Sequence, residues 1–231
     1  MLFPAGFRRG RGACGRVAAL TAFVEGGFRR SLGTGAVFLD LTAACGAVWR
    51  TGLLCRLSEG VPCWFARLVG LLLRDRRFGV RVGGGAGSWG PRRGGLPRGS
   101  VLAPILFSLC SSGLPVARGR GFVYADGVCL AVRGQCFGEL GCGLSSDVAR
   151  MSRFCRRWRL GPGASGAVSS AFHLRGTSAA RGLSVYLDGL RLRHECHPTC
   201  LGVALGRAMS CGEHLTKTAG KLKNRNNLLM K

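Results

Sequence analysis

Lysine and asparagine are absent from the first 216 residues of this 231-residue chain. All four lysines and all three asparagines lie in KTAGKLKNRNNLLMK (217–231), and Ile105 is the one isoleucine. These amino acids have codons rich in adenine, or in adenine and thymine, whereas the abundant glycine and arginine do not. Folding gives no reason for such a boundary, because exposed lysine and arginine replace one another where no bidentate contact is made. We interpret the boundary as clustered adenine-to-guanine change in the coding DNA, or as drift in a guanine-rich locus.

Acidic residues are also scarce. The chain has 10 aspartates and glutamates against 34 lysines and arginines, which gives a net charge of +24. Such an imbalance favours a polyanionic partner, and nucleic acid bound without sequence preference is the simplest expectation. The alternative is that base composition alone produced the charge and that no partner requires it.

The chain lacks a long apolar run. Its longest apolar segment, VLAPILFSLCSSGLPV (101–116), is short and broken by proline, so we expect no membrane span. The arginine-rich first residues do not resemble a secretory signal, and the 12 cysteines include no CxxC motif. Both observations favour a reducing intracellular compartment over secretion.

One cluster of histidines and cysteines stands out. The segment RHECHPTC (193–200) and the residues after it contain His194, Cys196, His197, Cys200, Cys211 and His214. Zinc ligands usually come in spaced pairs that converge on a tetrahedron, and this spacing differs from those pairs. We therefore predict no zinc site here.

Alternating strand and helix patterns run through the chain. We expect helices at 47–57, 62–76, 100–114 and 139–160, and strands at 35–41, 77–82, 167–174, 183–189 and 200–205. FVYADGVCLAV (122–132) is expected to form a hairpin in which Gly127 supplies a positive φ. VGGGAGSWG (82–90) lacks the ending of a phosphate loop and is expected to be a flexible loop. The pattern predicts an α/β or α+β fold, of which we choose α+β, with an antiparallel-containing sheet backed by helices on one face.

Two aspartates end apolar strands, Asp40 in VFLDL and Asp126 in VYADG. Neighbouring strands of one sheet would bring their carboxylates together, and carboxylates at short distance repel unless cations lie between them. The pair therefore suits Mg²⁺ held for phosphoryl transfer. Taken singly, each aspartate has the alternative interpretation of a turn or cap residue.

Four motifs occur in the order VFLDLTAACGAVW, GLPRGSVLAPILFSL, FVYADG and CLGV. In this order and at this spacing they resemble FLDLxxAYDxVW, G(L/V)PQGSVLxPxLFxL, YADD and YLGV of the reverse transcriptase domain of non-LTR retrotransposons. The resemblance covers about residue 20 to the C-terminus. It implies a reverse transcriptase-like domain at 20–231, with residues 1–19 left unassigned. The implied domain is a palm with partial fingers and a largely absent thumb.

The resemblance also implies roles for single residues. Asp40 and Asp126 match the catalytic aspartates that bind two Mg²⁺ ions, and Leu41, Arg98 and Gly99 match positions that bind nucleotide or template. The implied partners are an RNA template and a DNA primer, and the implied small-molecule substrates are deoxynucleoside triphosphates.

Several positions depart from the family pattern. Gly127 replaces the second aspartate of YADD, Cys45 an aromatic residue that packs under the nucleotide sugar, and Gly46 the aspartate after it. Arg98 replaces the glutamine of PQG, and Gly166 a lysine that protonates pyrophosphate in some polymerases. We therefore predict a degenerate, catalytically inactive copy. The alternatives are a non-catalytic basic protein that binds RNA or DNA, and a glycine-rich chain that does not fold stably.

Overall fold

Strand β1 (Gly33–Thr42) lies in the middle of a mixed sheet with the order β12-β9-β1-β7-β6. The other strands are β6 (Arg120–Tyr124), β7 (Gly127–Gly134), β9 (Val168–Phe172) and β12 (Arg193–His194), and β8 (Gly161–Pro162) pairs with the end of β1. The pairings are antiparallel except β12 with β9. This computed structural model describes residues 6, 10–42, 44–92, 94–115, 118–163, 166–174, 182–209, 215–216 and 218–220. Helices with a sheet of this kind confirm the α+β class.

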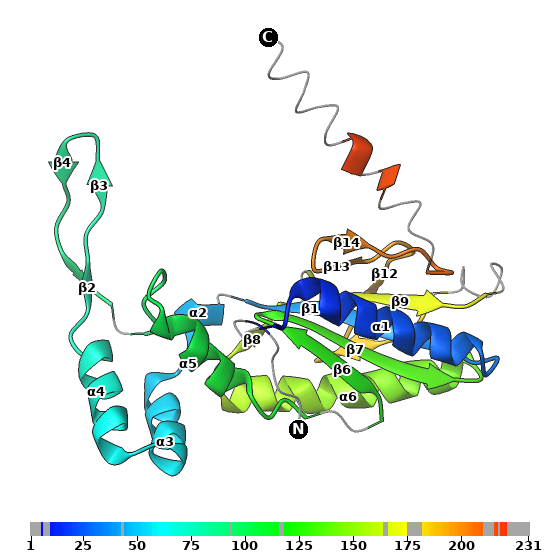
Figure 1. The fold of residues 1–231 in the computed structure, drawn as a ribbon, viewed down its shortest axis with the longest axis horizontal. Coiled ribbons are helices and arrows are strands. Elements are labelled where there is room, and N and C mark those ends of the chain that lie inside the picture. Colours follow the sequence, from blue (N-terminus) through cyan, green and yellow to red (C-terminus); the bar gives the residue numbers. More distant parts are fainter. Residues whose placement is uncertain are drawn as a thin grey trace, which may run out of the picture.

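Helices cover both faces of the sheet, not one (Figure 1). Alternate residues of β1 point to opposite faces, so Val37 and Leu39 pack toward α6 (Phe137–Arg157), whereas Phe38 packs in a second cluster with α1 (Ala13–Phe28). Helix α1 was not predicted from the sequence, because its apolar residues are spread around the helix among alanines and glycines. Helix α1 also crosses the boundary expected between residues 19 and 20.

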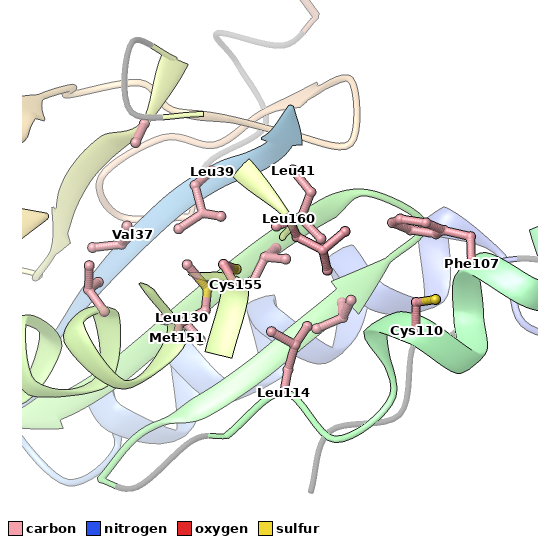
Figure 2. Packing of buried hydrophobic residues seen from close by; sticks show 14 of the residues in the cluster. Val37, Leu39, Leu41, Phe107, Cys110, Leu114, Leu130, Met151, Cys155 and Leu160 are labelled. Atoms are coloured by element: carbon pink, nitrogen blue, oxygen red, sulfur yellow. The ribbon is translucent and has the colours of Figure 1, made fainter. Parts of the chain in front are cut away.

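The larger core cluster lies between the sheet, α6 and α5 (Leu102–Ser111). Figure 2 shows Leu39, Leu130, Met151 and Cys155 meeting there, with Phe107 of α5 at one end. Each fully buried large apolar side chain stabilises the fold by about 1.5–3 kcal/mol. This packing holds β1 and β7 in place beneath the residues at their ends.

The far end of the β6–β7 hairpin is held by a buried carboxylate. The backbone N–H groups of Arg118 and Gly119 donate to the side chain of Asp147 on α6, at 3.1 and 2.8 Å. Asp147 is fully buried, so these bonds satisfy a group that would be costly to bury alone. These bonds attach the segment just before β6 to α6, at the end of the hairpin away from Asp126.

Helices α2 (Ala44–Ala47), α3 (Arg50–Gly60) and α4 (Cys63–Leu73) follow β1, and α3 to α6 lie within a few residues of the expected ranges. Trp49, beside α3, meets Trp158, beside α6, edge to face with ring centroids 6.5 Å apart. The guanidinium of Arg56 lies over Trp158, and that of Arg159 over Trp49. These stacked groups join α3 to the end of α6. Among the described residues, no helix is both long and apolar enough to span a membrane.

Residues 77–91 form a two-stranded ribbon, not the flexible loop expected at 82–90. It contains β2 (Arg77–Phe78), β3 (Arg81–Val82), β4 (Gly85–Ala86) and β5 (Gly90–Pro91), with β2 paired to β5 and β3 to β4. The two residues between Val82 and Gly85 are glycines, and Gly83 has φ +58°. A glycine pair of this kind closes a tight hairpin, so the signal was present in the sequence.

Two further segments fold as hairpins where a single strand was expected. They contain β10 (Tyr186–Leu187) with β11 (Leu190–Arg191), and β13 (Thr199–Cys200) with β14 (Val203–Ala204). Their turns are Asp188–Gly189 and Leu201–Gly202, and all four of these residues have positive φ. Two consecutive positive φ values fit the turn that matches strand twist, which explains the reversal of the chain.

Candidate active site

Asp40 and Asp126 lie at the ends of neighbouring strands. Asp40 is in register with Gly127 across the β1–β7 pair, and Asp126 immediately precedes β7. The backbone N–H of Leu41 donates to the carbonyl of Asp126 at 2.9 Å. Both aspartates are exposed to solvent, whereas the side chain of Leu41 is buried in the core. The structure thus places the two acids side by side, and Leu41 contributes its backbone there, not its side chain.

The turn that carries Asp126 does not need a glycine at position 127. The residue with positive φ is Ala125, at +52°, and Gly127 has no such conformation, so the expectation for Gly127 was wrong. A Cβ atom added at position 127 would lie 3.7 Å from Oδ1 of Asp40 and 3.1 Å from Cδ2 of Leu201. A small shift of Leu201 would admit it. A side chain at position 127 would therefore face Asp40 directly.

Although Asp40 is exposed, partial burial of its carboxylate raises its pKa, and the nearby charge of Asp126 raises that pKa further. A bound cation would relieve this repulsion. Mg²⁺ prefers oxygen ligands and is often held by one or two carboxylates together with water and phosphate oxygens. The exposed pair fits that requirement for one ion. Among the described residues, no group of three or more His, Cys, Asp and Glu side chains could hold a metal, His194, Cys196, His197 and Cys200 included; Cys211 and His214 lie outside those residues.

The loop GLPRGS lies against Cys45 and Gly46. The N–H of Leu96 donates to the carbonyl of Cys45, at 2.6 Å. Gly95 has φ +72°, and a Cβ atom there would lie 2.6 Å from the carbonyl oxygen of Gly46. Only glycine allows both this conformation and this close approach. Gly95 therefore fixes where the loop continues toward Arg98.

Besides burial, the charges of Arg98 and Asp126 shift the pKa of the Cys45 thiol in opposite directions. Burial raises the pKa of the Cys45 thiol, the charge of Arg98 opposes that rise, and the charge of Asp126 adds to it. Gly99 follows with φ +88° in open space. The structure therefore brings Cys45 and Arg98 to the same end of the sheet as Asp126.

Gly166 lies beside the other flank of Asp40. The carbonyl of Asp40 accepts from the N–H of Gly163 at 2.8 Å, and the N–H of Gly166 donates to Gly163 at 3.1 Å. A Cβ atom at position 166 would meet no atom within 4 Å. The structure leaves room there for a longer side chain.

A polar hollow of about 340 Å³ adjoins Asp40 and Gly166. Its wall also contains Arg193, Glu195 and His197, and the first two form an ion pair of 3.1 Å. From the sequence, His197 was considered only as a zinc ligand, and Arg193 and Glu195 were not expected at the site. Pairing of β12 with β9, which no local pattern predicted, brings this segment to the site.

A smaller cavity on the opposite flank of Asp40 is lined by Gly127, Arg16, Cys200 and Leu201, among others. Burial raises the pKa of the Cys200 thiol to about 11, with a further contribution from Asp40. Such a thiol stays protonated at neutral pH and is a poor nucleophile. The β13–β14 hairpin therefore closes this flank with unreactive side chains.

Replacing Gly95 with alanine should destabilise the loop that leads to Arg98. The new methyl group would collide with the Cys45 and Gly46 carbonyls and require a strained φ, so we expect a loss of about 2–4 kcal/mol in the free energy of unfolding. Chemical denaturation would measure it. Gly99→Ala is the matched control, because that glycine also has positive φ but no neighbour within 4 Å. Equal losses for both variants would contradict the close approach.

Comparison with known proteins identifies relatives over most of the chain. This chain is 28% identical to the probable RNA-directed DNA polymerase from transposon BS of Drosophila melanogaster, over 95% of this chain and 25% of that protein. It is 28% identical to the corresponding protein of transposon X-element of the same species, over 81% of this chain and 21% of that protein. The RNA-directed DNA polymerase from mobile element jockey of Drosophila funebris is 25% identical, over 96% of this chain and 25% of that protein.

The chain thus spans about a quarter of the length of these relatives. No protein-family model matches it. The matches over 95% and 96% of the chain span all four sequence motifs and the strands and helices that bring Asp40, Cys45, Arg98 and Asp126 together. The chain is a homologue of the RNA-directed DNA polymerases of non-LTR retrotransposons, consistent with a reverse transcriptase domain of that family.

Proposed function

We propose that this chain is a reverse transcriptase-like domain that binds nucleic acid but does not complete nucleotidyl transfer. The observation that carries the proposal is the pairing of Asp40 with Gly127, where a side chain would fit and would face Asp40. In this proposal the sheet with α1 and α6 is the palm, and α3, α4 and the ribbon belong to partial fingers. The domain expected at residues 20–231 therefore begins earlier in this proposal, because α1 starts at Ala13.

Asp40 and Asp126 would hold Mg²⁺ through their exposed carboxylates. When bound, the metal supplies positive charge that favours ionisation of a hydroxyl nucleophile and stabilises a leaving phosphate. Because residue 127 is glycine, no third carboxylate lies beside Asp40 and Asp126 at this position. The RNA template, the DNA primer and the deoxynucleoside triphosphates of the relatives' reaction would be the ligands of an intact site.

Two other positions lack side chains that would assist the reaction. Cys45 presents a small, half-buried thiol where a ring would pack against a sugar. Gly166 has no side chain to donate a proton to a departing pyrophosphate, although the space around it is open. Losing a positioned general acid and one metal ligand removes several orders of magnitude of rate. The proposed result is binding without synthesis.

Primer extension beside a binding measurement tests this proposal. We expect no extension of a DNA primer on an RNA template with Mg²⁺ or Mn²⁺, while fluorescence anisotropy detects binding of the same primer–template. A thermal melt of the same sample verifies folding. Processive incorporation would overturn the inactive site, and a folded chain that binds no nucleic acid would overturn the whole proposal.

A non-catalytic nucleic-acid-binding protein is the second candidate. The excess of 34 basic over 10 acidic residues favours it. Asp40→Asn with Asp126→Asn separates the two candidates, since a metal-assisted site would lose the part of its affinity that depends on Mg²⁺. A purely basic surface would bind nucleic acid at least as tightly without those two negative charges.

A further inference from the structure

The ribbon of residues 76–92, here called the arm, projects away from the sheet and its helices (Figure 1). Besides the β2–β5 and β3–β4 pairs, the N–H of Arg92 donates to Arg76 at 2.7 Å and that of Gly87 to Val80 at 2.8 Å. Every residue from Arg77 to Arg92 is exposed except Gly90, which is half-buried. The arm is thus ordered by its own hydrogen bonds and adds nothing to the core.

Two aromatic side chains lie on the arm, each against a glycine of the opposite strand. A Cβ atom at Gly90 would lie 3.1 Å from the ring of Phe78, and one at Gly79 would lie 3.7 Å from the ring of Trp89. Successive residues of an extended strand point to opposite faces, so the rings occupy opposite faces of the arm. Phe78 is 50% exposed and Trp89 is 72% exposed. Each face of the arm therefore presents one open ring.

Arginines flank both rings. Arg77, Arg81 and Arg92 are exposed, and no aspartate or glutamate occurs between residues 76 and 92. The nearest acidic residue in the sequence, Asp75, forms an ion pair with Arg74 at 3.9 Å, and Arg74 lies outside the arm. The charge of the arm is therefore not balanced within it.

Further positive charge gathers at the base of the arm. The Arg50 guanidinium donates to the carbonyls of Arg92, Gly94 and Gly95 at 2.7, 3.1 and 3.2 Å, and Arg76 donates to Gly95 at 3.1 Å. Carbonyl oxygens satisfy these donors without cancelling their charge. Burial lowers the pKa of Arg50, and the charges of Arg76 and Arg92 lower it further. An anion beside the arm would relieve that repulsion.

We propose that the arm binds single-stranded nucleic acid, with unpaired bases stacking on Phe78 and Trp89 and phosphates contacting Arg77 and Arg81. Aromatic rings set among arginines are the usual means of holding a single strand without sequence preference. Paired bases in a duplex do not offer their faces to such rings. The inference rests on the proposed nucleic-acid binding and assigns part of it to one element.

The test compares variants by fluorescence anisotropy at fixed salt, with a labelled oligonucleotide of about 15 nucleotides and the same sequence as a duplex. Phe78→Ala with Trp89→Ala should weaken binding of the single strand by about tenfold or more and leave duplex binding nearly unchanged. Trp64→Ala is the matched control, because this α4 residue is 66% exposed but lies outside the arm. It should bind both probes as the unmodified chain does.

Charge is tested separately from the rings. Arg77→Ala with Arg81→Ala should weaken binding of both probes, and more than the same loss of charge on α6 through Arg150→Ala with Arg153→Ala. If the ring variant binds the single strand normally, or loses duplex binding equally, the inference is overturned while the proposed function stands. If the folded, unmodified chain binds neither probe, the proposed function fails and the inference with it.

Discussion

Raising the salt concentration from about 50 to about 200 mM should lower the affinity of this chain for nucleic acid by about a thousandfold. Each phosphate neutralised by an arginine releases a condensed counterion, so affinity falls steeply with salt, and about six contacts suffice for this change. The arm exposes Arg77, Arg81 and Arg92. Helix α6 exposes Arg150, Arg153 and Arg157, besides Arg156, which forms an ion pair with Asp188. A charge of +24 makes such contacts the main source of affinity.

Anisotropy titrations at several salt concentrations give the slope of the logarithm of the association constant against the logarithm of the salt concentration. A slope near −5 corresponds to about six contacts on a duplex. RNA and DNA probes of unrelated sequence should give similar slopes and affinities. An affinity that does not change with salt, or one that differs strongly between sequences, would show that base contacts dominate instead.

Replacing Gly127 with aspartate should tighten Mg²⁺ or Mn²⁺ binding by about tenfold or more, since affinity for such ions rises with the number of charged oxygen ligands. The geometry favours this outcome because the new Cβ would lie 3.7 Å from Oδ1 of Asp40. Titration calorimetry measures the change. Gly127→Asn is the matched control, because it has the same size without the charge. Equal affinities for both variants would contradict a metal site between β1 and β7.

The same variant should lose stability in the absence of metal as pH rises. The pKa of Asp40 is already raised, by burial and then by Asp126, so the folded state binds this proton more tightly than the unfolded state does. For an acid of this kind stability falls as pH rises through the interval between the unfolded pKa, about 3.9, and the raised folded pKa. A third carboxylate extends that interval. Thermal melts should show the loss, and its reversal by Mg²⁺ or by Asp40→Asn.

DNA synthesis is not expected from Gly127→Asp alone, because Cys45 and Gly166 still lack the ring and the proton donor. Primer extension by this single variant at a rate near that of an intact polymerase would mean that those two positions do not limit the reaction. Gly127→Asp combined with Gly166→Lys is the informative next step, because the space at position 166 is open.

Long periodic segments made much of the fold predictable. The apolar stripe of α6 and the continuous apolar runs of β1 and β7 depend only on local sequence, and the structure shows these elements near their expected bounds. Helix α1 was missed because alanine and glycine dilute its apolar face. The hairpin at Asp188–Gly189 was missed although Asp-Gly is a common two-residue hairpin turn, whereas Leu201–Gly202 has no such recognisable pair.

The candidate site was likewise only partly predictable from the sequence. Motif order was enough to expect Asp40 beside Asp126, because both end strands of one hairpin-containing sheet. Arg193 and Glu195 could not be assigned to the site, since only the parallel pairing of β12 with β9 brings them there. The role of Gly127 was misjudged because sequence does not reveal which residue of a turn has positive φ, and here it is Ala125.

The ordinary backbone at Gly127 has an evolutionary consequence. No conformational requirement holds glycine there, so one codon change restores the acid without any repair of the hairpin. That change would nevertheless bring a third negative charge against Asp40, and in the proposed function Cys45 and Gly166 would still block turnover. On that proposal, the first step back toward an active enzyme would cost stability in the absence of metal and gain no activity. Reversion by successive single substitutions is therefore expected to be slow, even though positions 127 and 166 have room for the missing side chains.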